Sequence, residues 1–192
     1  MKTELIEFLS TFPELGKEEI ETIARNIPVV AHKKGTVLIK HGEVPRECYF
    51  VLKGIVRQYE TVDGEEKTTE FYTEKNGAVS SAHYVDQTPF EGYLVCAEDC
   101  LLIAGNMEVD QANYEKFPVL QAITRQMIES DLNSTKKKFV KFVGSSPKER
   151  YLNLMETQPD LLNRVPLHQI ASYLGMTAES LSRIRKRITE KH

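Results

Sequence analysis

Three patterns of hydrophobic and polar positions follow one another along the chain. The first segment is predicted to be helical because four apolar residues recur at the spacing of one helix face, namely Ile20, Ile23, Ala24 and Ile27. From Pro28 to about Met107 the chain consists of short β-prone runs separated by glycines, and Asp63-Gly64 is a strong hairpin signal. Many short strands at this spacing predict a compact all-β barrel or roll.

The third pattern is a long helix. From Val119 to Val143 the sequence has neither proline nor glycine, and apolar residues recur every three or four positions. A narrow stripe on so long a helix favours packing against a second helix, so we predict a dimerisation helix over 118–143. The predicted dimer seam consists of Leu120, Ile123, Met127, Ile128, Leu132 and Phe139. The alternative is that this stripe packs against the β domain of its own chain.

The rest of the chain predicts short helices joined by defined turns. Residues 144–147 are a candidate hinge, and Ser146 with Glu149 has the S-x-x-E spacing of a capping box at a helix start. The stretch "VPLHQIASYLGMTAESLSRIRKRI" then reads as one helix ending at Gly175 and another capped by Thr177. Two helices joined by a glycine-containing turn of about four residues are the helix-turn-helix pattern.

Charge is distributed unevenly along the chain. The net charge is -3, but residues 136–192 contain 12 Lys and Arg against 5 Asp and Glu. A cationic C-terminal third on an acidic body favours a polyanionic partner for that third alone. A solvated charged surface is the alternative, and the composition alone leaves it open.

The second helix of the motif has an outward face suited to reading base pairs. Glu179, Ser182 and Arg183 are predicted to contact bases, because Arg pairs with guanine and Glu accepts from cytosine in the major groove. Phosphate contacts are predicted for His168, Thr177, Ser180, Arg185, Lys186 and Arg187. The alternative for Glu179 and Arg183 is an exposed i,i+4 ion pair contributing ~0.3 kcal/mol.

These segments resemble the Crp/Fnr family of bacterial transcription regulators. "QIASYLGMTAESLSRIRKRI" resembles the helix-turn-helix of that family, and "GTVLIKHGEVPRECYFVLKGIVRQYE" resembles its cyclic-nucleotide-binding-type β roll. The resemblance implies an α+β chain with a jelly-roll-like sensor domain over 1–117, a dimerisation helix over 118–143 and a winged helix-turn-helix domain over 144–192. In the family pattern R-E-x-x-x-R, Glu179 and Arg183 match the second and third base-reading positions, and Ala178 replaces the first.

The pattern with which this family holds cyclic nucleotides is not reproduced. Family members that bind them use a Gly-Glu pair and, roughly ten residues on, an Arg-Ser pair. Here Gly77 is followed by Ala78, and the second pair falls at Phe90-Glu91. Because Glu91 would place a negative charge against the phosphate, we do not expect tight cAMP binding. Candidate residues for a different effector in the roll are Tyr72, Ser80, Ser81, His83, Glu91 and Thr135.

Other classes of function have less support in the sequence. Three cysteines without a CxxC pair do not predict a disulfide framework, a zinc site or an iron–sulfur cluster. The alternative function is a small cupin-like β-barrel metalloenzyme, or a haem sensor, using His32, His41 and His83. No H-x-H pair accompanies these histidines, so we predict no cofactor, no metal and no catalytic residue. A binding module that has lost DNA binding is a third possibility, against which the basic helix argues.

The expected partners follow from these predictions. They are double-stranded DNA and a second copy of the chain, with RNA polymerase as a further partner to test. No apolar run approaches the ~20 residues that span a bilayer, and the acidic start is not typical of a signal peptide. We therefore expect a cytoplasmic protein without membrane contact.

Overall fold

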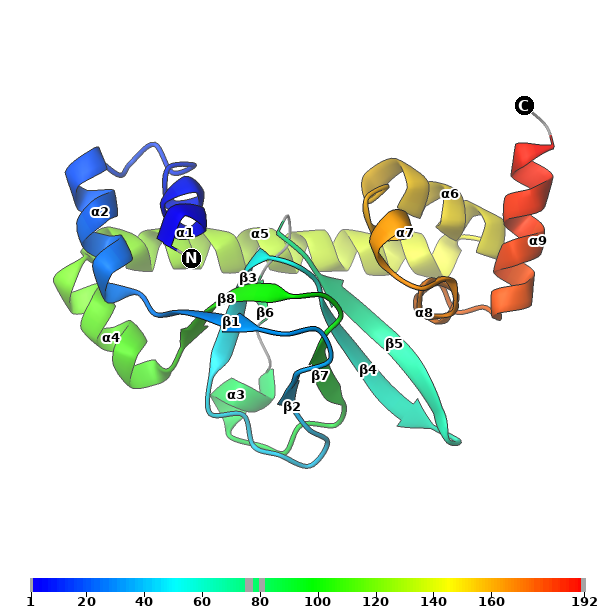
Figure 1. The fold of residues 1–192 in the computed structure, drawn as a ribbon, viewed down its shortest axis with the longest axis horizontal. Helices are drawn as coiled ribbons and strands as arrows, with labels where there is room; N and C mark the ends of the chain where they lie inside the picture. Colours follow the sequence, from blue (N-terminus) through cyan, green and yellow to red (C-terminus); the bar gives the residue numbers. More distant parts are fainter. Residues whose placement is uncertain (1, 75–77, 80–81, 191–192) are drawn as a thin grey trace. The chain divides into compact units, whose positions relative to one another are not determined.

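The structure is a computed structural model that describes residues 2–74, 78–79 and 82–190 (Figure 1). Within these residues the chain divides into two compact units. One comprises Met1–Gln58 and Phe71–Asn133, and the other comprises Tyr59–Glu70 and Ser134–His192. These bounds differ from the predicted 117/118 and 143/144 boundaries, because the long helix contributes to both units and a β-hairpin belongs to the second.

A β roll makes up most of the first unit. One sheet has the strand order β1-β8-β3-β6 and the other β2-β7-β4-β5. Their bounds are β1 Val29–His32, β2 Val37–Ile39, β3 Cys48–Lys53, β4 Val56–Val62, β5 Glu65–Tyr72, β6 Ala78–Val79, β7 Tyr93–Cys96 and β8 Cys100–Gly105. β8 pairs antiparallel with both β1 and β3. The predicted roll is therefore confirmed.

Side chains from both sheets fill the interior of the roll. Burial alternates along β7, where Leu94 and Cys96 are buried and their neighbours are half-buried, as expected for a strand with one face in a core. The buried cluster consists of Ile39, Val51, Val56, Phe90, Leu94, Cys96, Cys100 and Leu102. The turn of the β4–β5 hairpin has positive φ at both Asp63 (53°) and Gly64 (79°), as the D-G signal predicts.

A second core of the first unit lies among helices. α1 (Lys2–Leu9), α2 (Lys17–Asn26) and α4 (Met107–Lys116) gather around the N-terminal half of α5 (Pro118–Gly144), as Figure 1 shows. The predicted face of α2 is buried there at Ile20, Ile23 and Ala24. Leu120 and Ile123 of α5 belong to the same cluster, which also contains Leu5, Leu9 and Phe117. The remaining helix of this unit is α3 (Ala82–Asp86).

The second unit consists of helices and the end of the β4–β5 hairpin. Its helices are the end of α5, α6 (Pro147–Thr157), α7 (Leu161–Arg164), α8 (Leu167–Tyr173) and α9 (Ala178–Thr189). The capping box at the start of α6 is present: the Glu149 N–H donates to Ser146 Oγ, and the Ser146 N–H donates to Glu149 Oε2. Hydrogen bonding to Ser146 holds the pKa of Glu149 below its usual range.

The hairpin contacts α8 through a short polar network. The Thr68 N–H donates to Ser172 Oγ at 2.9 Å, and Ser172 Oγ donates to the Glu66 carbonyl at 3.2 Å. Next to them, the Tyr173 hydroxyl donates to Glu70 at 3.2 Å. These bonds attach the end of the hairpin to α8. The prediction for 144–192 was a winged helix-turn-helix, and no wing strand is present in its described residues, because 144–190 contain helices and no strand.

Candidate nucleic-acid interface

The two helices of the predicted helix-turn-helix are α8 and α9, with residues 174–177 between them. The sides of the two helices that face each other are apolar, and Ile170, Ala171, Leu174 and Leu181 are all buried. Ala171 is small, which permits close approach of α9. The hydrophobic register predicted for the motif is therefore present, with Leu181 at its centre and Ile184 and Ile188 half-buried.

The turn is fixed by backbone and cap hydrogen bonds. Gly175 has φ +68°, the left-handed conformation predicted for the end of α8. The Met176 N–H donates to the Ala171 carbonyl at 3.0 Å, which closes the turn. Thr177 then caps α9, because its Oγ1 accepts from the Ser180 N–H at 3.2 Å. The local sequence thus sets the direction in which α9 leaves the turn.

The outward face of α9 carries the predicted base-reading residues. Glu179 and Arg183 are exposed, with 87% and 68% of their side chains accessible, and they form an ion pair of 3.5 Å between Glu179 Oε2 and Arg183 Nη2. Ser182 is also exposed. At this exposure the pair contributes at most ~0.5 kcal/mol to stability, so both groups can be reoriented at little cost.

Cations continue along the same helix. Arg185, Lys186 and Arg187 are exposed, and Lys186 pairs with Glu190 at 3.8 Å. Among the residues that the structure describes, Arg185 and Arg187 have no carboxylate partner. Of the other predicted phosphate contacts, His168 is exposed in the first turn of α8, while the hydroxyls of Thr177 and Ser180 bond to each other at 3.0 Å.

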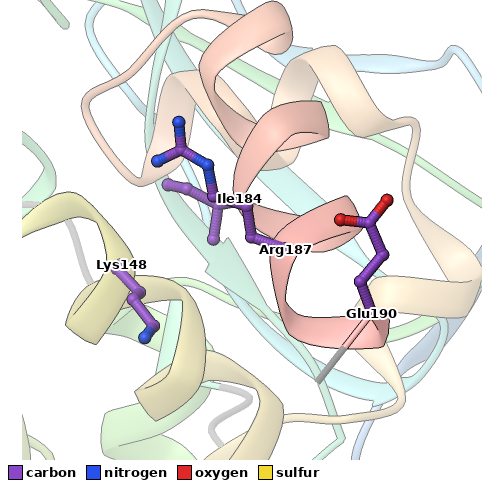
Figure 2. A pocket seen from close by; sticks show the side chains of 4 residues that line it. All are labelled: Lys148, Ile184, Arg187 and Glu190. Atoms are coloured by element: carbon purple, nitrogen blue, oxygen red, sulfur yellow. The ribbon is translucent and has the colours of Figure 1, made fainter. Parts of the chain in front are cut away.

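An open groove beside α9 is lined by one cationic residue, Lys148, that was not among the predicted phosphate contacts. It has a volume of ≈ 500 Å³ and is lined by Lys148 of α6 and by Ile184, Arg187 and Glu190 of α9 (Figure 2). Lys148 lies in the first turn of α6, and only the fold brings it near α9. The excess of basic residues in this third of the chain was the available signal, but it does not single out Lys148.

The predicted effector residues that the structure describes belong to two units, and Tyr72 and His83 have separate partners. Ser80 and Ser81 lie outside the described residues. Tyr72 donates to Gln58 at 2.9 Å, and His83 Nδ1 lies 2.9 Å from Thr88 Oγ1. Thr135 belongs to the second unit, whereas Tyr72, His83 and Glu91 belong to the first.

Phe90 and Glu91, the positions at which the family's Arg-Ser pair is expected from the sequence, have opposite environments. Phe90 is buried in the core of the roll, and Glu91 is exposed. The Glu91 backbone carbonyl lies 2.7 Å from His41 Nδ1. The carboxylate is therefore directed to solvent, and it is the Phe90 ring that fills the adjacent interior.

The predicted dimer seam divides into two parts along α5. Leu120 and Ile123 are buried in the helical core of their own unit, and Met127 packs against that core. These residues follow the alternative of intrachain packing and are not available to a second chain. Ile128, Leu132 and Phe139 are exposed, at 55%, 68% and 67%. Together with Thr135 they repeat at spacings of four, three and four residues, which is the pattern of a helix–helix seam.

The described residues contain neither a candidate metal site nor a helix that could cross a membrane. Within them, no group of three or more His, Cys, Asp or Glu side chains is arranged to hold a metal ion, and His32, His41 and His83 do not converge. The helices of this part of the chain include none with the length and apolar character that crossing a bilayer requires.

Comparison with known proteins places this fold in a defined class. Residues 29–108 match the family model described as a cyclic nucleotide-binding domain. FixK2 from Bradyrhizobium japonicum is 17% identical over 86% of this chain and 85% of its own, with a TM-score of 0.68. A CooA variant from Carboxydothermus hydrogenoformans is 16% identical over 97% and 84%, also at 0.68. The c-di-GMP-responsive global regulator CLP of Xanthomonas campestris is 18% identical over 90% and 91%, at 0.63.

These solved structures are Crp/Fnr family regulators. At such identities the likeness establishes the fold alone, and no curated protein sequence matches the chain. Residues 29–108 therefore resemble a cyclic nucleotide-binding domain, and the described chain shares the fold of these regulators: a β roll, a long helix and further helices. The predicted resemblance and the predicted α+β fold class are confirmed. The cupin-like enzyme alternative is not favoured by these comparisons.

Proposed function

We propose that the protein is a homodimeric transcription regulator that binds double-stranded DNA in a sequence-specific manner and is not an enzyme. The observation that carries this proposal is the exposed face of α9, where Glu179 and Arg183 stand beside a row of cations. A helix of this kind fits the major groove, in which Arg reads guanine and Glu reads cytosine. The cationic side chains of Arg185, Arg187 and Lys148 would contact phosphates. RNA polymerase remains a further partner to test.

The dimer follows from the exposed stripe on α5. Water-exposed Leu132 and Phe139 on a 27-residue helix are unfavourable unless a partner covers them. A two-fold axis along this helix would present two copies of α9 to adjacent major grooves, ~34 Å apart. The target would then be a near-palindrome.

Arg183→Ala tests the role of α9. Because the variant loses a bidentate contact to one base, we expect its affinity for the selected site to fall by ~1–3 kcal/mol and its preference at one base pair per half-site to disappear. Selection from random duplexes followed by titration at several salt concentrations measures both. Arg185→Ala is the matched control: it should weaken binding to all sequences and lower the salt slope by ~1, with base preferences retained. Unchanged preferences in Arg183→Ala would contradict the assignment.

The roll is proposed to bind a different effector from cAMP, or none. Buried Phe90 and exposed Glu91 occupy the positions where the family's phosphate-binding pair would stand. An apolar ring supplies no donor to a phosphate, and a buried phosphate without a positive partner is costly. In calorimetric titration we expect no heat of binding from cAMP at concentrations up to ~1 mM. Saturable binding in the micromolar range would contradict this proposal.

A further inference from the structure

Arg150 on α6 connects three separate segments of the second unit. Its Nε donates to the Phe142 carbonyl at 3.2 Å, in the last turn of α5, and to the Ser145 carbonyl at 3.1 Å, in the link between α5 and α6. Its Nη1 donates to the Leu174 carbonyl at 3.2 Å, where α8 ends. The guanidinium also stacks on the Phe142 ring, 3.8 Å from the centroid.

The chemistry of these acceptors explains why an arginine stands there. The last carbonyls of a helix have no donor within the helix, and the helix dipole makes that end negative. Two helix ends, those of α5 and α8, meet at one guanidinium, whose planar fork donates in fixed directions and stacks on an aromatic face. A lysine ammonium would satisfy part of this set but would not hold the same geometry.

Gly175 leaves the space that this arrangement needs. A Cβ atom at Gly175 would lie 3.1 Å from Arg150 Nη1 and 3.4 Å from Phe142 Cζ. The helix-turn-helix turn is thus packed directly against the stacked Arg150–Phe142 pair. The same residue that closes the turn also permits its attachment to the end of α5.

We propose that Arg150 is a positioning residue that fixes the helix-turn-helix on the end of α5 and so sets the distance between the two recognition helices of the dimer. This inference rests on the proposed function. α5 carries the exposed seam, and α6 is joined to it only through Ser145 and Ser146. Without the Arg150 contacts, rotation at this link would move α9 relative to the dimer axis, and the preferred half-site separation would broaden.

The experiment is a spacer series. Palindromic duplexes built from the selected half-site are varied by one and two base pairs at the centre, and affinities are measured for wild type, Arg150→Met and Arg150→Lys. Wild type should prefer one spacer by ~10-fold or more, and Arg150→Met should reduce this preference to ~3-fold or less with half-site base preferences unchanged. Arg150→Lys keeps the charge and should still lose most of the preference.

Lys148→Met is the matched control, since it removes a cation from the same helix without touching the three carbonyls. It should weaken binding equally for all spacers. Thermal unfolding of each variant separates a loss of folding from a loss of positioning. If Arg150→Met and Arg150→Lys keep the wild-type spacer preference, or lose affinity equally for all spacers as they lose stability, the inference is wrong. A wild type that selects no duplex sequence would instead contradict the proposed function itself.

Discussion

Replacing Leu132 and Phe139 together by aspartate is expected to convert the protein from a dimer to a monomer. Both side chains are about two-thirds exposed in the single chain, at 68% and 67%, so the substitution removes little packing within it. In a two-fold seam each residue occurs twice, and burying each of the four side chains contributes ~1.5–3 kcal/mol. Aspartates at the same positions would bring like charges together without water, which opposes association further.

The effect on DNA binding should be large because the two half-sites are then bound independently. Loss of the second binding module lowers the apparent affinity for a palindrome by ~10²–10⁴-fold. Sedimentation equilibrium measures the mass, and titration with the selected palindrome and with a single half-site measures affinity. Half-site affinity should change little, since α9 is untouched.

Val140→Asp is the matched control for this variant. Val140 is 65% exposed and directly follows Phe139, but it lies off the four–three–four repeat, at a position that faces away from a partner helix. The control should remain a dimer and bind the palindrome as wild type does. A double variant that stays dimeric, or a Val140→Asp that dissociates equally, would mean that α5 does not form the seam.

The start of α6, the end of α8 and the start of α9 could be predicted from the sequence because their signals are local. Ser146 with Glu149, Gly175 and Thr177 act on backbone groups within a few residues, and each performs the predicted role. Such signals do not depend on what packs against the segment. The same reasoning explains why the D-G turn at 63–64 was predicted correctly.

The long helix shows where periodicity alone is insufficient. Leu120 and Leu132 are equally apolar and lie in the same helical pattern, yet one is buried in its own unit and the other is exposed. A stripe of residues predicts that a face will be covered and does not say by which element. The covering helix α1 was not predicted, so the assignment of Leu120 to the seam could not be corrected from the sequence.

Contacts between residues distant in the sequence could not be predicted either, because no local pattern encodes them. In the sequence, Arg150 is one of several basic residues with no distinguishing feature. In the structure, it donates to the carbonyls of Phe142, Ser145 and Leu174. From the sequence, the hairpin at 59–70 was assigned to the roll. In the structure, Ser172 hydrogen-bonds to it. α4 was not predicted. Asn106 caps its start, but the helix buries no residue completely and so has no strong apolar face in the sequence.

Leu181→Ala should destabilise the helix-turn-helix by ~2–5 kcal/mol, because it deletes three carbons from a side chain that is 0% exposed. Leu181 packs where α8 and α9 cross, so the cavity would lie in the joint that orients the recognition helix. Chemical denaturation measured by circular dichroism gives the change in midpoint. DNA affinity should fall with it even though Glu179 and Arg183 are unchanged, because their positions depend on this joint.

Leu152→Ala makes the same chemical change on α6 of the same unit, where the side chain is 40% exposed. It leaves no enclosed cavity, so the expected loss is below ~1 kcal/mol, with DNA affinity retained. The difference between the two losses of stability therefore measures the effect of burial, because the chemical change is the same. Equal losses from both substitutions would show that Leu181 is not the centre of the α8–α9 joint, and the orientation of α9 would then have to depend on contacts outside it.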